Sequence, residues 1–568
     1  MISHDILIVG SGLTGLRAAI EAFDGGADVA VVTKLFPIRS HSTQAQGGIN
    51  ASLANHPEGR DDNWEKHAFD TIKGSDFLAD QDAVEVFAME APMDVYQLEN
   101  WGCPFSRFPD GKIAQRPFGG AGFPRTCFGA DKTGLYLMNT LYEQTIRRNV
   151  KFYEEWVALA LIVEDQVCRG IVAYNLPKGV LEVFKAKAVI FSTGGNLRIY
   201  PKTSNSLSST ASGLTIALNA GLPLKDMEFV QFHPTTLVGL NLTLTEGARG
   251  EGAYLLNGLG ERFMSRYVSE AIMERAPRDI TSRSIQTEID EGRGIGGGDY
   301  VYLDMRHLGA DNIRERFPTV YELCTQFRGV DPTREQIPIQ PSAHYSMGGI
   351  DCDLNCRTEV EGFFAAGECA CVGIHGANRL GGNSLMETVV FGRHAGASAV
   401  QYLKDISRKS TGNGVYKDAL LKQEKRLKII FEKTSTENQY QIKSQLGSIM
   451  QEKAGIFRHE EGLKEALSEL KTLQKRFRKV KAPSKGQNFN YDLMWHLDIE
   501  GFLTISEAIL MGALAREESR GSHARRDYRE RDDRHWLKHT VARLTKGKIA
   551  LSYKPVTITK FGVEKRVY

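Results

Sequence analysis

The chain has few cysteines and little proline, and the shortage of cysteine already excludes some classes of protein. Eight cysteines among 568 residues are too few for a disulfide framework. Cys352 and Cys356 are four apart, and Cys369 and Cys371 two apart, so neither pair has the CxxC spacing of a zinc knuckle or a thioredoxin site. We therefore expect reduced thiols in structural roles, and no metal site.

Long hydrophobic runs are also missing. The longest, Val157–Val163, has seven residues, whereas a helix needs about 20 to cross a bilayer. The first residues lead directly into a strand-like run at Asp5 and do not have the pattern of a signal or transit peptide. We expect an intracellular protein that does not itself span a membrane but that can bind a membrane partner.

The chain has no excess of charge of either sign. Its 71 basic and 69 acidic residues leave a net charge of +2, which argues against a nucleic-acid partner bound through bulk charge. Glycine, by contrast, is abundant, with 56 residues against only 18 prolines. This combination indicates tight turns and close approach of the backbone to a ligand. The length suggests roughly three to four domains.

The first 34 residues predict a nucleotide-binding βαβ unit. The apolar run Asp5–Val9 predicts a buried parallel strand, Leu13–Phe23 has helical spacing, and Asp28–Lys34 predicts a second strand. Between the first strand and the helix lies the GxGxxG pattern Gly10-Ser11-Gly12-Leu13-Thr14-Gly15.

Each glycine of this pattern has a physical task. Gly10 permits the tight turn, Gly12 lets a pyrophosphate approach the backbone, and Gly15 allows close helix–strand packing, while the helix N-terminus faces the anion. A second match, Gly292–Gly297, follows polar residues and precedes no helix, so we interpret it as a flexible turn. The second strand ends in Thr33-Lys34 without the acidic residue that usually holds a ribose, which argues against a plain NAD site.

Later segments predict an interrupted sheet followed by helices. Ala188–Ser192 and Gly362–Ala366 are strand-like and each leads into a glycine-containing turn. Strands so far apart can share one sheet only if chain is inserted between them, and we place this insertion at about 227–343. Residues 416–482 are rich in Lys and Glu, with apolar positions at helical spacing, and predict a helical bundle.

A polar segment after the second strand carries a family resemblance. Residues 39–48, RSHSTQAQGG, closely resemble the R-S-H-T-x-x-A-Q-G-G loop of the succinate dehydrogenase and fumarate reductase flavoprotein subunits. In that family the histidine carries FAD through a covalent bond to the 8α position of the flavin. The resemblance implies that His41 is the attachment point, with Ser42 standing where Thr is usual.

Further motifs of the same family follow in order along most of the chain. They are Gln231–Thr235 (QFHPT), Thr245–Gly252 (TEGARGEG), Arg278-Asp279, His344–Gly349 (HYSMGG), Gly367-Glu368, His375–Leu385 (HGANRLGGNSL), Arg516–Gly521 (REESRG) and Trp536–Thr540 (WLKHT). One position departs from the pattern. The family has T-G-D-G where this chain reads Thr210-Ala211-Ser212-Gly213, so Ser212 replaces an aspartate that touches the cofactor.

The resemblance implies an α/β architecture of four domains. A Rossmann-like FAD-binding domain would comprise residues 1–226 and 344–415, interrupted by an α+β capping domain at 227–343 that closes over the substrate. A helical domain would follow at 416–530 and a small C-terminal domain at 531–568.

The resemblance also implies a role for each site residue. Arg278 would exchange a proton with the substrate, with Glu246 and Arg249 as its relay. Succinate and fumarate are dianions, so their site needs cationic and hydroxyl donors at both ends. The implied substrate-binding residues are His233, Thr245, His344, Arg379, Phe118 and Gly47. The implied FAD-binding residues are Gly10, Ser11, Gly12, Thr14, Gly15, Lys34, Ser40, His41, Ser42, Gln46, Gly47, Gly48, Thr193, Gly194, Gly195, Glu368, Ser384 and Leu385.

The implied function is that of a flavoprotein subunit that interconverts succinate and fumarate. Such subunits pass electrons to an iron–sulfur subunit and, through a membrane anchor, to a quinone; this chain has no cysteine pattern for a cluster. We expect peripheral attachment at the cytoplasmic face of the cell membrane, with the charged stretch 516–534 either facing the iron–sulfur partner or solvated.

Several alternatives remain open at this point. The reaction can run as succinate oxidation or as fumarate reduction. The sequence slightly favours succinate oxidation, and a quinol:fumarate reductase is the alternative. L-aspartate oxidase, with noncovalent FAD, is disfavoured by His41 and by Leu380–Asn383 (LGGN). A noncatalytic nucleotide-binding scaffold is disfavoured by the set of dianion-binding residues.

Overall fold

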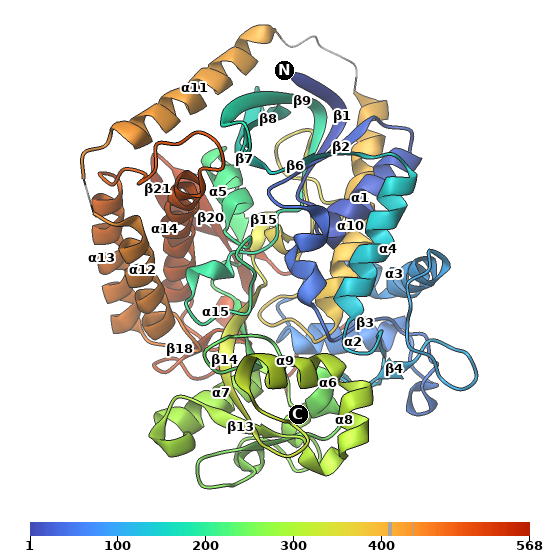
Figure 1. Ribbon diagram of the computed structural model, residues 1–568. Helices are drawn as coiled ribbons and strands as arrows, with labels where there is room; N and C mark the ends of the chain where they lie inside the picture. The colour runs from blue at the N-terminus through green and yellow to red at the C-terminus, as the bar shows by residue number, and fades with distance from the viewer. Residues whose placement is uncertain (407–411, 436, 568) are drawn as a thin grey trace.

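The structure is a computed structural model that describes residues 1–406, 412–435 and 437–567. Residues 407–411, 436 and 568, which fall in the predicted first, helical and C-terminal domains, lie outside the described residues. Figure 1 shows three masses: a sheet with its helices at the upper right, a group of helices at the left and a smaller lobe at the bottom.

The central sheet has the strand order β6-β2-β1-β9-β8-β7. Strands β1, β2, β6 and β9 run parallel, whereas β7 and β8 are antiparallel additions. The parallel strands are β1 Ile2–Val9, β2 Val29–Thr33, β6 Lys151–Glu154, β9 Val180–Phe191 and the short β16 Phe363–Ala365; the antiparallel pair is β7 Trp156–Glu164 and β8 Val167–Asn175. The predicted strands from both sides of the insertion therefore belong to one sheet.

Strand β9 joins the two parts of this sheet. Its first half pairs with β8, from Val180 to Lys185, and its last three residues pair with β16. The carboxyl ends of four parallel strands lie at the same edge of the sheet. These strands are β1, β2, β9 and β16. A ligand of an open parallel sheet binds at that edge.

Helices α1 (Leu13–Asp24) and α10 (Asn383–Asp405) pack closely on the sheet. Gly392 and Gly396 make this possible, because a Cβ at either position would lie within 3 Å of an α1 backbone oxygen. Neighbouring helices are α2 Trp64–Gly74, α3 Gln81–Asn100 and α4 Thr133–Arg147. Together they form the right-hand side of Figure 1.

The lower lobe has a hydrophobic core of its own, from Leu237 to Ile339. Its antiparallel sheet has the order β11-β14-β13-β12. The elements are β11 Val230–Leu237, α6 Glu246–Gly250, β12 Tyr254–Leu256, α7 Arg278–Asp290, β13 Val301–Asp304, α8 Ala310–Arg316, α9 Pro318–Arg328 and β14 Ile337–Ser346. The glycine-rich segment Gly292–Gly297 within it is a turn with three residues at positive φ, as predicted.

The left-hand group contains the predicted helices. They are α11 Asn413–Glu432, α12 Gln439–Lys453, α13 Glu460–Phe477 and α14 Tyr491–Ala515. On α13, Leu463, Leu470 and Phe477 are buried and Leu467 packs against them. The amphipathic interpretation of this segment is confirmed. The mixed α/β class, with an inserted lobe and a helical part, is confirmed as well.

The last strands form a hairpin that completes a sheet begun much earlier. Strands β20 (Lys538–Thr545) and β21 (Lys548–Pro555) pair with each other, and β20 pairs with β10 (Leu224–Lys225). Strands β15 (Gly349–Asp351) and β17 (Ala370–Cys371) continue that sheet on the other side. The β20–β21 hairpin is thus anchored on strands of the first predicted domain. The exact division into four domains stays a prediction.

The prediction that the charged stretch 516–534 lies at the surface is wrong for its first half. Arg516, Glu518 and Arg520 are at most 1% exposed. The Arg516 guanidinium donates to Glu228 at 2.8 Å and to Glu518 at 2.9 Å. These charges tie the end of α14 to the segment before β11. Buried, mutually paired charges of this kind are not available to a partner; Glu517 is exposed between them, and the next exposed residue is Arg526.

A buried histidine in this region predicts a pH dependence of stability. The His539 ring lies between Asp226, at 2.6 Å, and Asp80, at 3.1 Å. Burial alone would lower the pKa of His539, but the two carboxylates outweigh it and raise the pKa from 6.5 to about 9. Because the folded-state pKa is the higher one, the stabilisation is complete below pH 6.5 and is lost as the pH rises toward 9.

We therefore expect the midpoint temperature of thermal unfolding to decrease as the pH is raised from 6.5 to 9. In the His539→Gln variant this temperature should depend less on pH. The measurement is thermal unfolding at a series of pH values. The exposed His535 gives a matched control, His535→Gln. Parallel profiles for wild type and the His539 variant would contradict the assignment.

Candidate functional site

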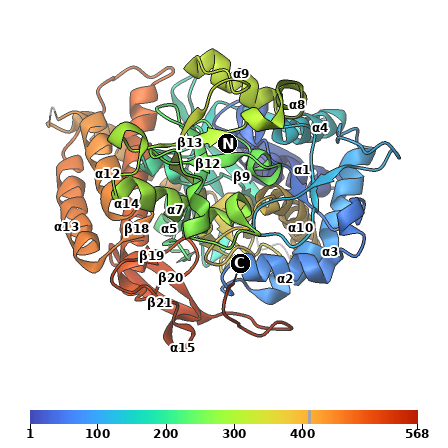
Figure 2. The same cartoon turned by 90° about the horizontal axis from the view of Figure 1, so that it is seen from below.

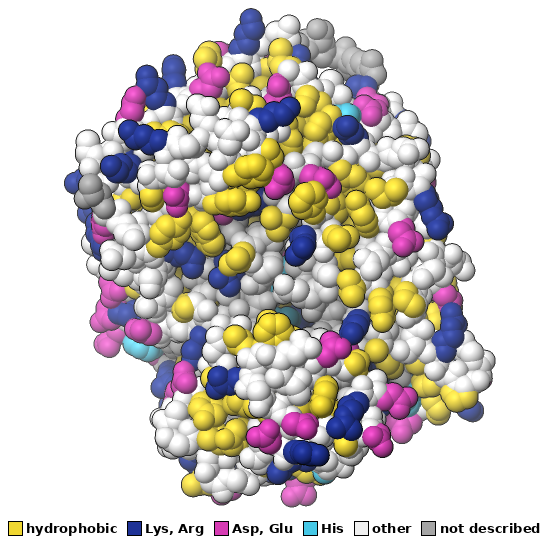
Figure 3. All heavy atoms as spheres, viewed as in Figure 1, with side chains coloured by type: hydrophobic (Ala, Val, Ile, Leu, Met, Phe, Trp, Pro, Cys, Tyr) yellow, Lys and Arg dark blue, Asp and Glu magenta, His cyan; other side chains and the backbone are white. Residues whose placement is uncertain are grey.

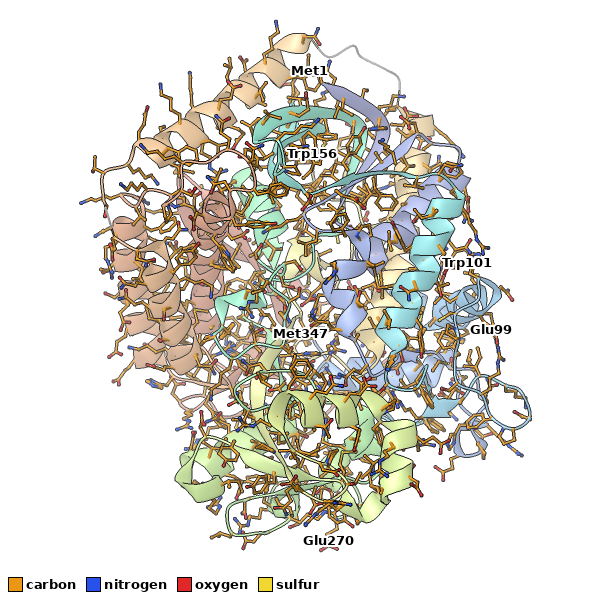
Figure 4. All side chains as sticks on the ribbon, in the orientation of Figure 1. Met1, Glu99, Trp101, Trp156, Glu270 and Met347 are labelled. Atoms are coloured by element: carbon orange, nitrogen blue, oxygen red, sulfur yellow. The ribbon has the colours of Figure 1, made fainter. Side chains whose placement is uncertain are left out.

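A cavity of about 570 Å³ lies between the carboxyl edge of the central sheet and the lower lobe. Figure 3 shows the surface hollowed at the seam between these two parts. One end of the cavity is lined by the GxGxxG turn and by Trp156–Ala158, and the other by residues of α6, α7, β11 and β14. Trp156 marks the first end in Figure 4, well above the lower lobe. The cavity is therefore elongated and joins the predicted cofactor and substrate residues.

The GxGxxG turn forms the first end as the sequence predicts. Gly10 has a φ of +110°, and a Cβ there would lie 2.2 Å from the Ser192 carbonyl oxygen. Helix α1 begins just beyond it, and its N-cap residue, Gly12, has no side chain to cap the first turn. The Leu13 amide donates to the Ser42 hydroxyl at 3.5 Å, and the amides that follow it are available to an anion. Gly15 does not line the cavity; a Cβ there would meet the Gly10 carbonyl oxygen at 2.0 Å. Its role is packing.

Lys34 lines the same end and has an acidic partner from a distant segment. Its ammonium lies 2.6 Å from the Asp498 carboxylate of α14 and 3.5 Å from the Thr210 hydroxyl. Ser212, which replaces the family's aspartate, begins the adjacent helix α5 (Ser212–Asn219) and also lines the cavity. The carboxylate beside Lys34 is thus Asp498, which the sequence gave no reason to select.

The middle of the cavity is formed by the segment around His41. Ser40, Ser42, Gln46, Gly47 and Gly48 line it, together with the predicted residues Thr193, Gly194, Glu368, Ser384 and Leu385. Gly195 does not line it; a Cβ there would lie 2.4 Å from a Glu368 carboxylate oxygen.

Two acid–base groups in the middle have strongly shifted pKa values. Burial raises the pKa of Glu368 to about 7. Burial also lowers the pKa of His41 to about 4, so its ring is neutral at physiological pH. The His41 Nδ1 accepts a hydrogen bond from the Ser206 backbone amide at 3.3 Å.

Strands β11 and β14 bring two histidines to the second end. Gln231 pairs with Tyr345 and Phe232 with Ala343, so His344 is an extra residue in β14. Such a bulge redirects a side chain. The His233 and His344 rings lie 4.9 Å apart, and the Ser204 hydroxyl holds the Nδ1 of His344 at 2.8 Å. Thr245 and Phe118 line the cavity beside them.

The cations of this end are held by one carboxylate and one amide. Arg278, the first residue of α7, donates to Glu246 at 2.6 Å and to the Gln231 side-chain oxygen at 3.3 Å. Arg379 donates to the same Gln231 oxygen at 3.0 Å. The Gln231 amide nitrogen is bound to Asn378 and to the Arg379 carbonyl, which fixes the oxygen toward both guanidiniums.

Arg249 lies behind this group and does not line the cavity. Its guanidinium is 3.6 Å from the Glu246 carboxylate, and both side chains are 1% exposed. Burial alone would raise the pKa of Glu246, but Arg278 and Arg249 hold it below its usual range. Glu246 is therefore a charged group that connects the two arginines.

The charge at this end suits a dianionic ligand. Arg278, Arg249 and Arg379 carry three positive charges against the single charge of Glu246, an excess of two. Burial and the nearby arginines push the pKa of His233 well below its usual value, so the histidines add neutral polar groups. Burial also lowers the pKa of Arg379, to about 9, and leaves its Nε without a partner. A bound carboxylate would relieve this cost.

The residues present also fit a flavin dinucleotide. The Gln46 side-chain oxygen and the Thr193 hydroxyl are buried in the middle of the cavity without a hydrogen-bond partner. A polar ligand with donors and acceptors along its length would satisfy them. The N-terminus of α1, at the opposite end of the cavity from the arginines, supplies an anion site.

Known proteins support this interpretation. Residues 5–385 match the FAD binding domain family, and residues 443–568 match the Fumarate reductase flavoprotein C-term family. The succinate dehydrogenase flavoprotein subunit of Rickettsia conorii is 42% identical, covering 99% of this chain and 98% of that protein. The fumarate reductase flavoprotein subunit of Escherichia coli is also 42% identical, covering 99% and 96%.

Solved structures agree with the sequence matches. The quinol fumarate reductase of E. coli superposes with a TM-score of 0.96 at 40% identity, over 100% of this chain and 99% of that one. Sdh1 of Mycobacterium smegmatis has a TM-score of 0.85 at 35% identity, over 99% and 95%.

The chain belongs to the succinate dehydrogenase and fumarate reductase flavoprotein family. It is accordingly an FAD-binding oxidoreductase, as the resemblance implied. The prediction of FAD as cofactor is confirmed.

The sequence analysis missed two residues of this family site. Gln231 stands in a motif that was recognised, but only the structure shows its oxygen between Arg278 and Arg379. Ser204 lies in no such motif and was found only through its contact with His344.

The Gln231 bridge predicts a measurable loss. In Gln231→Leu the acceptor disappears while the side-chain volume is nearly kept. A hydrogen bond to a charged group contributes about 1.5–3 kcal/mol, so we expect kcat/KM for succinate to fall by about 10- to 100-fold. The assay is succinate-dependent reduction of an artificial electron acceptor, with flavin content measured in parallel. Unchanged kcat/KM at full flavin content would contradict the role.

Proposed function

We propose that this chain interconverts succinate and fumarate, with succinate oxidation as the favoured direction and with FAD bound covalently to His41. The observation that carries the proposal is the excess of two positive charges beside Arg278, at the end of a cavity built for a dinucleotide. The flavin, when bound, accepts or supplies the hydride that one carbon of the substrate exchanges.

The residues of the chain would bind the two carboxylates and move the proton. Arg379, His233 and His344 offer donors for one carboxylate, and Thr245 offers a hydroxyl for the other. Arg278 would exchange a proton with the carbon next to the one that exchanges hydride. A guanidinium gives up a proton only with strong help. Glu246, at 2.6 Å, and Arg249 behind it form the route by which that proton is replaced.

Support for the covalent bond comes from the hydrogen bond of His41. A neutral imidazole alkylated at Nε2 has no proton on Nδ1, which can then accept a hydrogen bond but cannot donate one. The Ser206 amide is a donor at that nitrogen. The neutral ring at physiological pH, a consequence of its burial, is also the form that can act as a nucleophile.

We extend the proposal to the partners and the location. Related structures include a quinol-fumarate reductase with menaquinol molecules and Sdh1 in complex with UQ1. No helix in the described part of this chain is long and apolar enough to cross a bilayer. We infer that electrons pass to an iron–sulfur subunit and then to a quinone at a membrane anchor, with this chain attached peripherally at the cytoplasmic face.

The experiment is an activity assay in both directions. The purified, flavin-loaded chain is given succinate with an oxidising dye, or fumarate with a reduced viologen, and L-aspartate with the same dye as the competing substrate. We expect turnover with succinate and fumarate and none with L-aspartate. Turnover with L-aspartate alone would overturn the proposal in favour of an aspartate oxidase.

A further inference from the structure

Residues 556–567 cross from the last hairpin to the lower lobe, and we call this segment the strap. It leaves β21 and passes the start of α3, where the Gln81 side chain accepts hydrogen bonds from three successive strap amides, those of Thr559, Lys560 and Phe561. Near its end, Arg566 contacts Asp279 at the start of α7, and Figure 2 shows the strap running next to α2. The strap therefore bridges the body of the protein and the lobe that carries Arg278.

The strap ends in a buried ion pair with the lobe. The Arg566 guanidinium donates to both carboxylate oxygens of Asp279, at 2.6 and 3.0 Å. The side chains of Arg566 and Asp279 are 7% and 0% exposed. Asp76, of the body, lies 3.8 Å from the same guanidinium. A two-point contact between a guanidinium and a carboxylate fixes orientation as well as distance.

Asp279 is the residue next to Arg278 in the first turn of α7. The helix begins at Arg278, and Pro277 in front of it provides no side-chain cap. The contacts of Asp279 therefore help to set the direction of this first turn, together with those of Arg278. Arg283, one turn later, adds a bond to Asp279 at 3.2 Å and a bond to the Gly521 carbonyl of the body at 2.6 Å.

The opposite side of Arg278 is held by Glu246 and Gln231, as described above. Glu246 and Arg278 both belong to the lobe, so their contact does not fix the lobe against the body. The strap contact does, because Arg566 reaches the lobe from a segment anchored on α3. Burial alone would raise the pKa of Asp279, but Arg566 and Arg283 hold it low, so the pair stays charged.

We propose that Arg566 is a positioning residue for Arg278: through Asp279 the strap holds the first turn of α7 against the body, with the Arg278 guanidinium directed into the cavity. This inference rests on the proposed role of Arg278 in proton transfer. When the strap contact is lost, Asp279 keeps the longer contact with Arg283 and the Ile280 amide of its own helix, and the first turn of α7 gains freedom. Small displacements of a reacting group are costly; a shift of about 1 Å can lower a rate by 10²-fold.

The test compares two variants of the strap in the flavin-loaded protein. Arg566→Gln removes the contact with Asp279. Lys560→Gln is the matched control, since it removes the exposed ion pair between the same strap and Glu65. We expect kcat for succinate oxidation to fall about 10- to 100-fold in Arg566→Gln, with a smaller change in KM, a larger solvent deuterium isotope effect and full flavin content. Lys560→Gln should match wild type, and Arg566→Lys should recover part of the loss.

Two further measurements, hydrogen exchange and wild-type activity, distinguish a failure of the positioning role from a failure of the proposed function. Hydrogen exchange at the start of α7 should become faster in Arg566→Gln and stay unchanged in Lys560→Gln. If wild type oxidises succinate and Arg566→Gln retains its kcat and isotope effect, the positioning role is overturned while the proposed function stands. If wild type itself does not act on succinate or fumarate, the proposed function fails. A loss of flavin or of thermal stability in Arg566→Gln, with unchanged turnover per bound flavin, would also overturn the positioning role.

Discussion

Replacing Arg278 by alanine is expected to lower the rate of succinate oxidation by about 10²- to 10⁴-fold, the range typical of a lost acid–base group. The reason is geometric. Arg278 is the cavity-lining group that contacts Glu246, at 2.6 Å, while Arg249 lies behind that carboxylate and outside the cavity. In the proposed relay Arg278 carries the proton between Glu246 and the substrate, so the substitution removes that carrier. The measurement is kcat for succinate-dependent dye reduction in the flavin-loaded protein.

The exposed Arg328 at the end of α9 provides a control on the same lobe. Arg328→Ala removes one positive charge from the lobe without touching the cavity, so its rate should equal that of wild type. If Arg278→Ala keeps more than about a tenth of the wild-type rate at full flavin content, another group moves the proton. The relay through Glu246 would then have to be abandoned.

Replacing His41 by alanine is expected to abolish acid-stable flavin. Wild-type protein precipitated with acid and washed should keep flavin fluorescence in the pellet, because a covalent bond survives unfolding. In His41→Ala the cavity still has the GxGxxG turn and the α1 N-terminus, so flavin should bind but leave with the supernatant. His307, on the lower lobe and outside the cavity, serves as the control position.

The outcome decides between a flavoprotein with FAD bound covalently to His41 and an L-aspartate oxidase with noncovalent FAD. Flavin in the wild-type pellet that is lost in His41→Ala would establish the bond and exclude a noncovalent aspartate oxidase. Flavin released from a well-loaded wild-type sample would contradict the covalent proposal, although the dinucleotide cavity would remain.

Local patterns were sufficient to predict the elements around the cofactor. The apolar runs of β1 and β2 and the glycines between β1 and α1 act over short distances, so the βαβ unit could be read directly. The two pairings of β9, first with β8 and then with β16, could not be predicted in this way. The pairing with β16 depends on where the chain re-enters the sheet after the inserted lobe. The charged stretch after α14 was misassigned because burial of Arg516 requires Glu228, nearly 300 residues away, and no local pattern reveals such a partner.

The candidate site was predictable to the extent that its residues stand in motifs. His233, His344, Arg278 and Arg379 come from four separated motifs, and the structure brings them to one end of the cavity. Their arrangement was not predictable. The bulge at His344 follows from strand register, and the Lys34–Asp498 pair joins residues that no spacing rule connects.

The most direct test of the account is anaerobic mixing of the oxidised, flavin-loaded protein with succinate while the visible flavin absorption is followed. The account predicts that succinate bleaches the flavin, that added fumarate restores its colour, and that L-aspartate leaves it unchanged. A flavin that succinate does not bleach and that fumarate does not reoxidise after chemical reduction would contradict the claim that this cavity interconverts the two dianions.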